Sequence, residues 1–193
     1  MDGCPSRLYR LGSSSPTDLV DKLSADSESP PVKSSISIAI KKNSSSLMML
    51  YFLRFPDLHQ VAVLSKDCPE VLVGEESLED LLSVSMNLIP KTSWVFKAMN
   101  ILLDDMVFSI GYLDHGVTST SKIALLEVLD LTPSSSTHLD DSVQRIQAAC
   151  MKYLGEEGWR SLSEVGVDSP PSSEAAMTQS RARRWVAALA LGS

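Results

Sequence analysis

The feature that most constrains the fold of this chain is a short run of strict alternation. Over residues 35–40, isoleucine occupies every second position, as Ile36, Ile38 and Ile40. Successive side chains of a β-strand point to opposite faces, so this spacing places the three isoleucines on one face of a sheet. The next apolar segment, residues 47–55, is apolar on both faces, which is typical of a central strand covered on each side. The core is therefore predicted to form on a β-sheet.

Five further segments have strand-like patterns. They span residues 61–63, 71–73, 94–99, 106–112 and 123–131. Short polar links join neighbouring segments, which favours antiparallel pairing of consecutive strands. The strands fall into two groups, one before and one after a helical segment. The sequence therefore predicts an α+β fold built on an antiparallel sheet.

Four segments have helical periodicity. They span residues 16–23, 77–88, 139–154 and 174–193. The apolar stripe of the second helix consists of Leu78, Leu81, Leu82 and Met86. Pro90 follows this helix and ends it, and Gly155 stands where a C-terminal cap of the third helix is expected. We expect one or two of these helices to cover the sheet.

The length and composition of the chain favour one domain. A chain of 193 residues, 44% of them hydrophobic, can bury one sizeable core. Residues 1–15 are rich in turn-forming residues and are predicted to be a flexible N-terminal lead. Residues 16–165 are predicted to form the single α+β domain, residues 166–173 a linker, and residues 174–193 a C-terminal helix.

Charge and cysteine usage limit the partners that this chain can have. The formal net charge of −7 argues against direct binding of nucleic acid, because an acidic surface repels phosphate backbones. A protein partner with a basic face suits it better. Cys4, Cys68 and Cys150 have the spacing of neither a disulfide framework nor a metal site, which favours a reducing compartment. The longest dense apolar run, residues 47–53, is too short to span a bilayer. We expect a soluble protein without a membrane partner.

No known catalytic motif is present. The sequence has no Walker-type phosphate loop, no Gly-x-Gly-x-x-Gly turn and no Gly-x-Ser-x-Gly elbow. The histidines are expected in exposed turns, at His59, His115 and His138. Asp104–Asp105 and Asp140–Asp141 fit a turn and a helix N-terminus better than paired carboxylates, and Cys150 fits a helical core. We therefore expect no catalytic, cofactor-binding or metal-binding residue and no enzymatic activity.

The C-terminal helix carries the candidate binding residues. In an otherwise acidic chain it contains Arg181, Arg184, Trp185 and Leu189. One interpretation is a docking helix whose apolar face enters the groove of a protein partner while its arginines meet an acidic rim. The other is a helix that packs on its own sheet with its arginines in water. For Trp185 the second interpretation is favoured.

Two stretches of the chain resemble a known family. The first contains Leu50–Leu53, a break at Phe55–Pro56, Val61–Leu64, Val71–Val73, the acidic turn Gly74–Glu76 and Leu78–Leu82. The second contains residues 105–111 and 122–128, which look like paired strands with a glycine-bearing turn. The order of these motifs resembles that of Mediator complex subunit 20, a TBP-related factor of the head module. Two features depart from the family: it begins with a strand almost at once, and the linker before the last helix is long here.

This resemblance implies an antiparallel β-barrel with flanking helices and no catalysis. It further implies a nuclear protein that forms a heterodimer with Mediator subunit 18 and is tethered to the head through subunit 8. Such a subunit would help to relay activator and repressor signals to RNA polymerase II.

Other readings of the sequence remain open. A longin-like adaptor would place strands and helices in a different order, and a pleckstrin-homology-like barrel would leave the helix at 77–88 unexplained. A small enzyme or ligand-binding barrel would need an apolar pocket, whose candidate lining is Met48, Met49, Met106 and Phe108.

Overall fold

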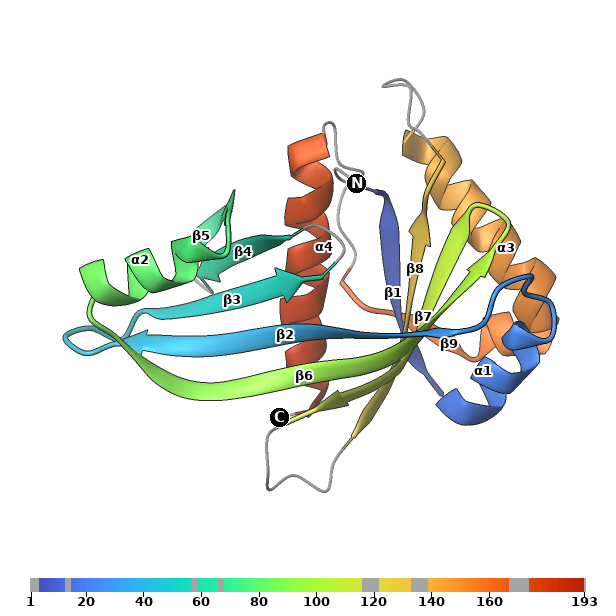
Figure 1. Cartoon of the computed structure of the whole chain (residues 1–193), viewed down its shortest axis with the longest axis horizontal. Helices are drawn as coiled ribbons and strands as arrows, with labels where there is room; N and C mark the ends of the chain where they lie inside the picture. The colour runs from blue at the N-terminus through green and yellow to red at the C-terminus, as the bar shows by residue number, and fades with distance from the viewer. Residues whose placement is uncertain are drawn as a thin grey trace.

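The structure, a computed structural model, describes residues 4–12, 15–56, 59–65, 68–115, 122–132, 139–166 and 174–192. Within them the chain forms one antiparallel sheet of nine strands and four α-helices (Figure 1). The strands are β1 (Ser6–Leu11), β2 (Val32–Asn43), β3 (Met49–Phe55), β4 (Gln60–Ser65), β5 (Cys68–Gly74), β6 (Leu88–Leu103), β7 (Met106–Asp114), β8 (Ile123–Asp130) and β9 (Leu162–Glu164). The helices are α1 (Pro16–Ser24), α2 (Ser77–Ser85), α3 (Leu139–Arg160) and α4 (Glu174–Leu189), the last followed by a 3-10 turn, Ala190–Gly192. The α+β class and the antiparallel sheet are confirmed.

The sheet is open, in the order β5-β4-β3-β2-β6-β7-β8-β1-β9. Among the described strands the edges are β5 and β9, so the barrel that the resemblance implied does not form. The physical reason is the position of α4, which contacts strands in both halves of the sheet, including β5 and β1. A helix in this space keeps the two edges apart.

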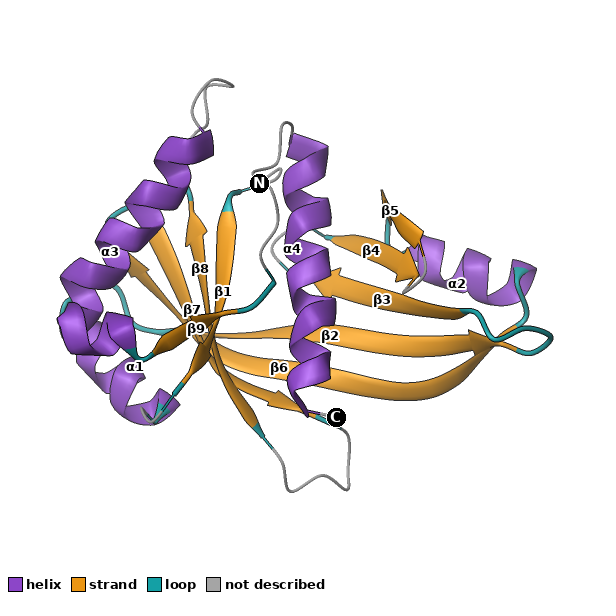
Figure 2. Cartoon of the chain, turned by 180° about the vertical axis from the view of Figure 1, so that it is seen from behind, coloured by secondary structure: helices purple, strands orange, loops and turns teal. Residues whose placement is uncertain are grey.

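One face of the sheet, here called the inner face, packs against α4. Figure 2 shows α4 lying across the strands on this side. The three isoleucines of β2 all face inward, as their alternation predicted, and belong to the same buried cluster as Trp185. Because Ala182, Ala188 and Leu189 join this cluster, the C-terminal helix is part of the core of the domain.

The opposite face, here called the outer face, carries the other helices. Helices α1 and α3 cover one half, where Phe108, Leu126 and Ile146 form a buried cluster. Helix α2 covers the other half over Phe52 and Val63. The helices thus pack on both faces of one sheet, which explains why β3 and β8 are apolar on both sides.

The predicted flexible lead is wrong for residues 6–11, which form β1. This strand lies between β8 and β9, and its Leu8 and Tyr9 side chains are buried on opposite faces. Its sequence pattern does not alternate, since both faces are covered, and this is why it was overlooked. The three-residue β9, which pairs with β1, was missed as well. The predicted linker lies outside the described residues except for Gly166.

The helices start and end close to their predicted bounds, with two refinements. The third helix is interrupted at Gly155, where the cap was expected and where φ is 77° and ψ 171°, and helical turns then continue to Arg160. In α2, Leu78 and Leu82 pack on the sheet, whereas Leu81 points to solvent. None of the described helices has the length and apolar character needed to cross a bilayer.

A glycine at position 111 allows β6 and β7 to approach closely. A Cβ atom built on Gly111 would lie 1.9 Å from the carbonyl oxygen of Lys97 and 2.7 Å from the Cα atom of Ala98. Both are backbone atoms, which cannot move aside as the end of a side chain can. The pairing of these two strands therefore requires glycine.

We predict that Gly111→Val lowers the free energy of unfolding by about 3 kcal/mol or more, because the strands must separate to admit the side chain. Urea unfolding followed by circular dichroism measures this change. Ser93→Val, an equally β-branched substitution at an exposed position of β6, is the control and is expected to change stability little. A Gly111→Val protein as stable as the control would contradict the steric argument.

Candidate protein-interaction site

The residues predicted to bind a partner are buried against the chain's own sheet. Trp185 is 0% exposed, and Arg181, Arg184 and Leu189 are buried as well. The Trp185 ring lies 4.8 Å from the ring of Phe96, centroid to centroid. The interpretation that Trp185 packs on its own sheet is thus what the structure shows. In this conformation the four side chains are buried against the chain's own sheet. A partner-binding role for them stays a prediction.

Arg181 and Arg184 of α4 are buried and not in water, contrary to the sequence-based expectation, whereas Arg183 is exposed. Arg181 donates from Nε to Glu127 Oε1 at 2.7 Å and from Nη2 to Oε2 at 2.9 Å. Trp185 Nε1 donates to the same Oε1 at 3.0 Å, and the Arg181 guanidinium lies 4.3 Å from the centroid of the Phe55 ring. The acidic group that the arginine was expected to find on a partner is therefore Glu127 of β8.

Arg184 fastens α4 to the N-terminal strand. It donates to the backbone oxygen of Ser6 and, at 2.9 Å, to Ser180 Oγ. A sequence-only reading placed these guanidinium groups outside because buried arginines are rare unless they are paired. Glu127 lies 54 positions from Arg181 in the chain, and Ser6 lies 178 positions from Arg184. No local sequence pattern could therefore reveal these partners.

The titratable residues considered for chemistry do not come together. His115 is partly buried, with its Nε2 2.6 Å from Thr92 Oγ1 and its ring 4.4 Å from that of Trp94, so it is not a freely exposed turn histidine. His59 is exposed in a turn as predicted, and His138 lies outside the described residues. Burial raises the pKa of the Cys150 thiol to about 12, which fits a core residue. Asp104 binds Lys152 Nζ at 2.8 Å and the Tyr153 hydroxyl at 2.6 Å.

The methionine-lined pocket of the ligand-barrel reading does not form. Met106 and Phe108 are buried beneath α3, whereas Met48 packs in the separate cluster beneath α2. Among the described residues, no group of three or more His, Cys, Asp or Glu side chains has the arrangement of a metal site.

An exposed apolar surface lies at the end of the molecule formed by α2 and the β2–β3 turn (Figure 1). Four large side chains define this apolar tip: Leu47, Leu81, Val84 and Ile89. Their exposed fractions are 85% for Leu47, 66% for Leu81, 83% for Val84 and 55% for Ile89. Leu81 and Val84 are three positions apart, so they share one face of α2. The sequence contained this signal, but Leu81 was assigned to the buried stripe.

Polar contacts hold the apolar tip in place. Asn43 of β2 donates from Nδ2 to the backbone oxygen of Met86 at 2.6 Å, and Asn87 donates from Nδ2 to Ser44 Oγ at the same distance. These bonds join the β2–β3 turn to the end of α2. The tip is therefore one surface built from two segments, and not a pair of loose ends.

A buried ion pair fixes α2 to the sheet. Glu79 accepts from Lys41 Nζ at 2.8 Å and from Arg54 Nη2 at 2.9 Å. Burial alone would raise the pKa of Glu79, but the hydrogen bonds from Lys41 and Arg54 outweigh it and the pKa lies below its usual value. The carboxylate is thus charged when α2 is docked.

Acidic residues and an open strand edge adjoin the tip. Glu75, Glu76 and Asp80 are exposed at the start of α2. Strand β5 leads directly into this helix and is an edge of the sheet, with Leu72 exposed. An apolar surface beside a free strand edge can bind an apolar protein surface. The carboxylates at the start of α2 can pair with basic groups of such a partner, and Lys42 and Lys91 beside Ile89 can pair with acidic ones.

The fold and this surface define a class: an α+β protein whose open antiparallel sheet bends around a C-terminal helix and exposes an apolar tip. The sequence matches no protein-family model, and no curated protein matches it at a significant level. Among solved structures, the chain is similar to a component of the Mediator head module of Schizosaccharomyces pombe. The identity is 8% and the TM-score 0.49, over 77% of this chain and 94% of that one.

Other solved structures are similar to the same degree. The PH1012 protein of Pyrococcus horikoshii OT3 is 10% identical, with a TM-score of 0.47, over 82% of this chain and 93% of that one. A candidate adenylate cyclase of Bacillus halodurans is 8% identical, with a TM-score of 0.46, over 87% and 95%. Similarities at this level define neither a family nor an activity nor a partner.

We predict that Trp185→Ala lowers the free energy of unfolding by about 3–5 kcal/mol, because it leaves a large cavity and removes a donor from Glu127. Urea unfolding provides the measurement. His59→Asn is the control: the residue is exposed, its φ of 51° is one that asparagine tolerates, and stability is expected to stay the same. Unchanged unfolding of Trp185→Ala would show that α4 is not docked as described.

We also predict an acid-sensitive contribution from Glu79. Its folded-state pKa is lowered, so the stabilisation is present above the ordinary glutamate pKa of about 4.3 and is lost as the pH falls through the folded-state value. Measured against pH, the unfolding free energy of Glu79→Gln should therefore fall less steeply in acid than that of the unsubstituted chain. Glu76→Gln, at an exposed position nearby, should keep the original slope. Parallel curves for all three proteins would refute the prediction.

Proposed function

We propose that this chain is a non-catalytic subunit that acts by binding other proteins. The observation that carries the proposal is the apolar tip, where Leu81, Val84 and Leu47 extend into solvent from a rigidly held helix and turn. Large exposed apolar side chains gathered at one end of a molecule are typical of protein interaction sites. Glu75, Glu76 and Asp80 at the start of α2 favour basic groups on the part of the partner that meets that end of the helix.

The more specific proposal is a subunit of the Mediator head of the subunit 20 type. In this role the chain forms a heterodimer with Mediator subunit 18, is tethered through subunit 8, lies in the nucleus and helps to relay regulatory signals to RNA polymerase II. It needs no cofactor, nucleic acid or membrane. The support is the order of motifs over residues 50–82 and 105–128, and these segments form β3, β4, β5, α2, β7 and β8 in sequence.

One departure from that family disappears in the structure. The family begins with a strand almost at once, whereas the sequence pattern of this chain predicts no strand before Pro16. Strand β1 supplies it, starting at Ser6 and pairing with β8. This removes an objection to the proposal.

Co-expression with Mediator subunits 18 and 8 of the same species tests the proposal directly. The three chains are expected to elute together from a size-exclusion column, whereas separate elution of soluble, folded chains would overturn the Mediator assignment.

The contribution of the tip is tested with the double substitution Leu81→Ser and Val84→Ser. Both side chains are largely exposed, so the unfolding free energy is expected to change little. If the tip is the binding surface, affinity for subunit 18 should fall about tenfold or more, measured by isothermal titration calorimetry. Met151→Ser, at a half-exposed apolar position of α3, is the matched control. An affinity that responds equally to both variants would move the binding surface away from α2.

A further inference from the structure

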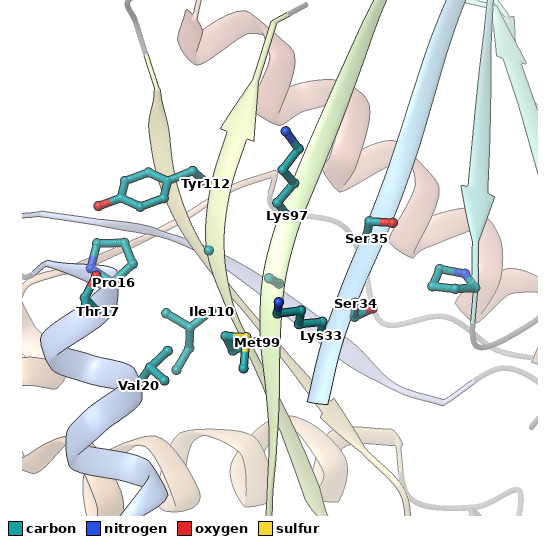
Figure 3. A pocket seen from close by; sticks show the side chains of 13 residues that line it. Pro16, Thr17, Val20, Lys33, Ser34, Ser35, Lys97, Met99, Ile110 and Tyr112 are labelled. Atoms are coloured by element: carbon teal, nitrogen blue, oxygen red, sulfur yellow. The ribbon is translucent and has the colours of Figure 1, made fainter. Parts of the chain in front are cut away.

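A concave surface lies on the outer face, where neither α1 nor α2 covers the sheet completely. It is a cleft of about 720 Å³ between α1 and the strands β2, β6 and β7 (Figure 3). Its apolar lining comes from Val20 of α1, Met99 of β6, and Ile110 and Tyr112 of β7. Gly111 lies between the last two and, like Ala98, adds little side chain to the lining. Most of the lining surface is therefore apolar, and Thr17, Ser34 and Ser35 add polar groups to it.

Lysines border this cleft. Lys33 of β2 and Lys97 of β6 line it and are exposed. Within the described residues neither forms an ion pair, in contrast to Lys41 with Glu79 and Lys152 with Asp104. A third lysine, Lys122, places its Nζ 6.0 Å from the centroid of the Tyr112 ring.

This cluster is unusual in a chain of net charge −7. Three acidic residues follow it closely along α1 and β7, namely Asp18, Asp21 and Asp114, and none of them is part of the lining. Positive charge that is not neutralised beside an apolar lining creates a local potential of the opposite sign to the molecule as a whole.

We propose that this cleft binds an acidic segment of a protein partner, in which Asp or Glu side chains flank a large apolar or aromatic side chain. The carboxylates pair with Lys33 and Lys97, and the apolar side chain enters between Val20 and Tyr112. An exposed lysine–carboxylate pair contributes little by itself, so the apolar contact supplies the larger part of the affinity. A nucleic acid fits less well, because its long phosphate backbone would meet the acidic surface around the cleft.

This site is distinct from the apolar tip. The tip is formed by α2 and the β2–β3 turn, with carboxylates and lysines both nearby, whereas the cleft lies beside α1 and is bordered by lysines. The inference therefore goes beyond the proposed function and does not depend on which complex the chain joins.

Fluorescence anisotropy with a labelled synthetic peptide tests the inference. The probe alternates Asp and Glu with Leu and Phe, and two comparison probes replace its acidic residues by lysine or its apolar residues by serine. The unsubstituted protein is expected to bind the first probe and neither comparison. No binding of the first probe, or equal binding of the serine probe, would overturn the proposal.

Variants locate the site. Lys33→Ala and Lys97→Ala should each weaken binding about fivefold at low salt, because each removes one exposed ion pair. Tyr112→Ala should weaken it by a similar factor or more. Lys42→Ala, at an exposed position near the far end of β2, is the matched control and should bind like the unsubstituted protein. An equal loss in Lys42→Ala, or no loss in the two lysine variants, would place the peptide elsewhere.

The same variants separate this inference from the proposed function. The double variant Lys33→Ala and Lys97→Ala should still elute with Mediator subunits 18 and 8, and the tip variant should still bind the acidic peptide. Failure of peptide binding with intact assembly would overturn the cleft alone. Failure of assembly with intact peptide binding would overturn the Mediator proposal alone.

Discussion

The structure depends on the docking of α4 on the inner face of the sheet. Its centre is the buried group formed by Glu127, Arg181 and Trp185, in which one carboxylate accepts three hydrogen bonds. Leaving either charge without the other in this environment would cost about 3–5 kcal/mol, so the pair sets one position and one orientation for the helix. Phe55 of β3 and Phe96 of the central strand β6 pack against the same two side chains. The two halves of the sheet are thereby held by one helix.

The remaining surfaces follow from this arrangement. Because α4 fills the inner face, α1, α2 and α3 all pack on the outer face, where they cover its two ends and leave β2 and β6 partly bare between them. That gap is the lysine-bordered cleft. Helix α2 has nine residues and packs one of its faces on the end of the sheet. Nothing among the described residues covers its opposite face, so Leu81 and Val84 are exposed to solvent. Both candidate binding surfaces are thus consequences of how few helices share a large sheet.

The two proposed binding surfaces differ in their charged neighbours. Acidic residues at the start of α2 and the exposed Lys42 and Lys91 lie near the apolar tip, whereas lysines border the cleft. The surfaces lie on different elements, so two partners can bind them without competing for the same residues. This arrangement fits a role in connecting proteins.

The sequence by itself determined most of the elements and little of their arrangement. Alternation in β2 and helical spacing in α1, α2 and α3 are local properties, and they predicted which residues share a face. They could not reveal β1, because a strand covered on both faces has no alternation and arginine interrupts it twice. The tertiary structure alone decided three features. These are the burial of Arg181 and Arg184, the outward direction of Leu81, and the position of Lys33 and Lys97 at one cleft. The physical reason is that the spacing of residues along the chain determines which side chains share a face of one helix or strand. The neighbours that this face contacts depend on the packing of strands and helices that are far apart in the sequence.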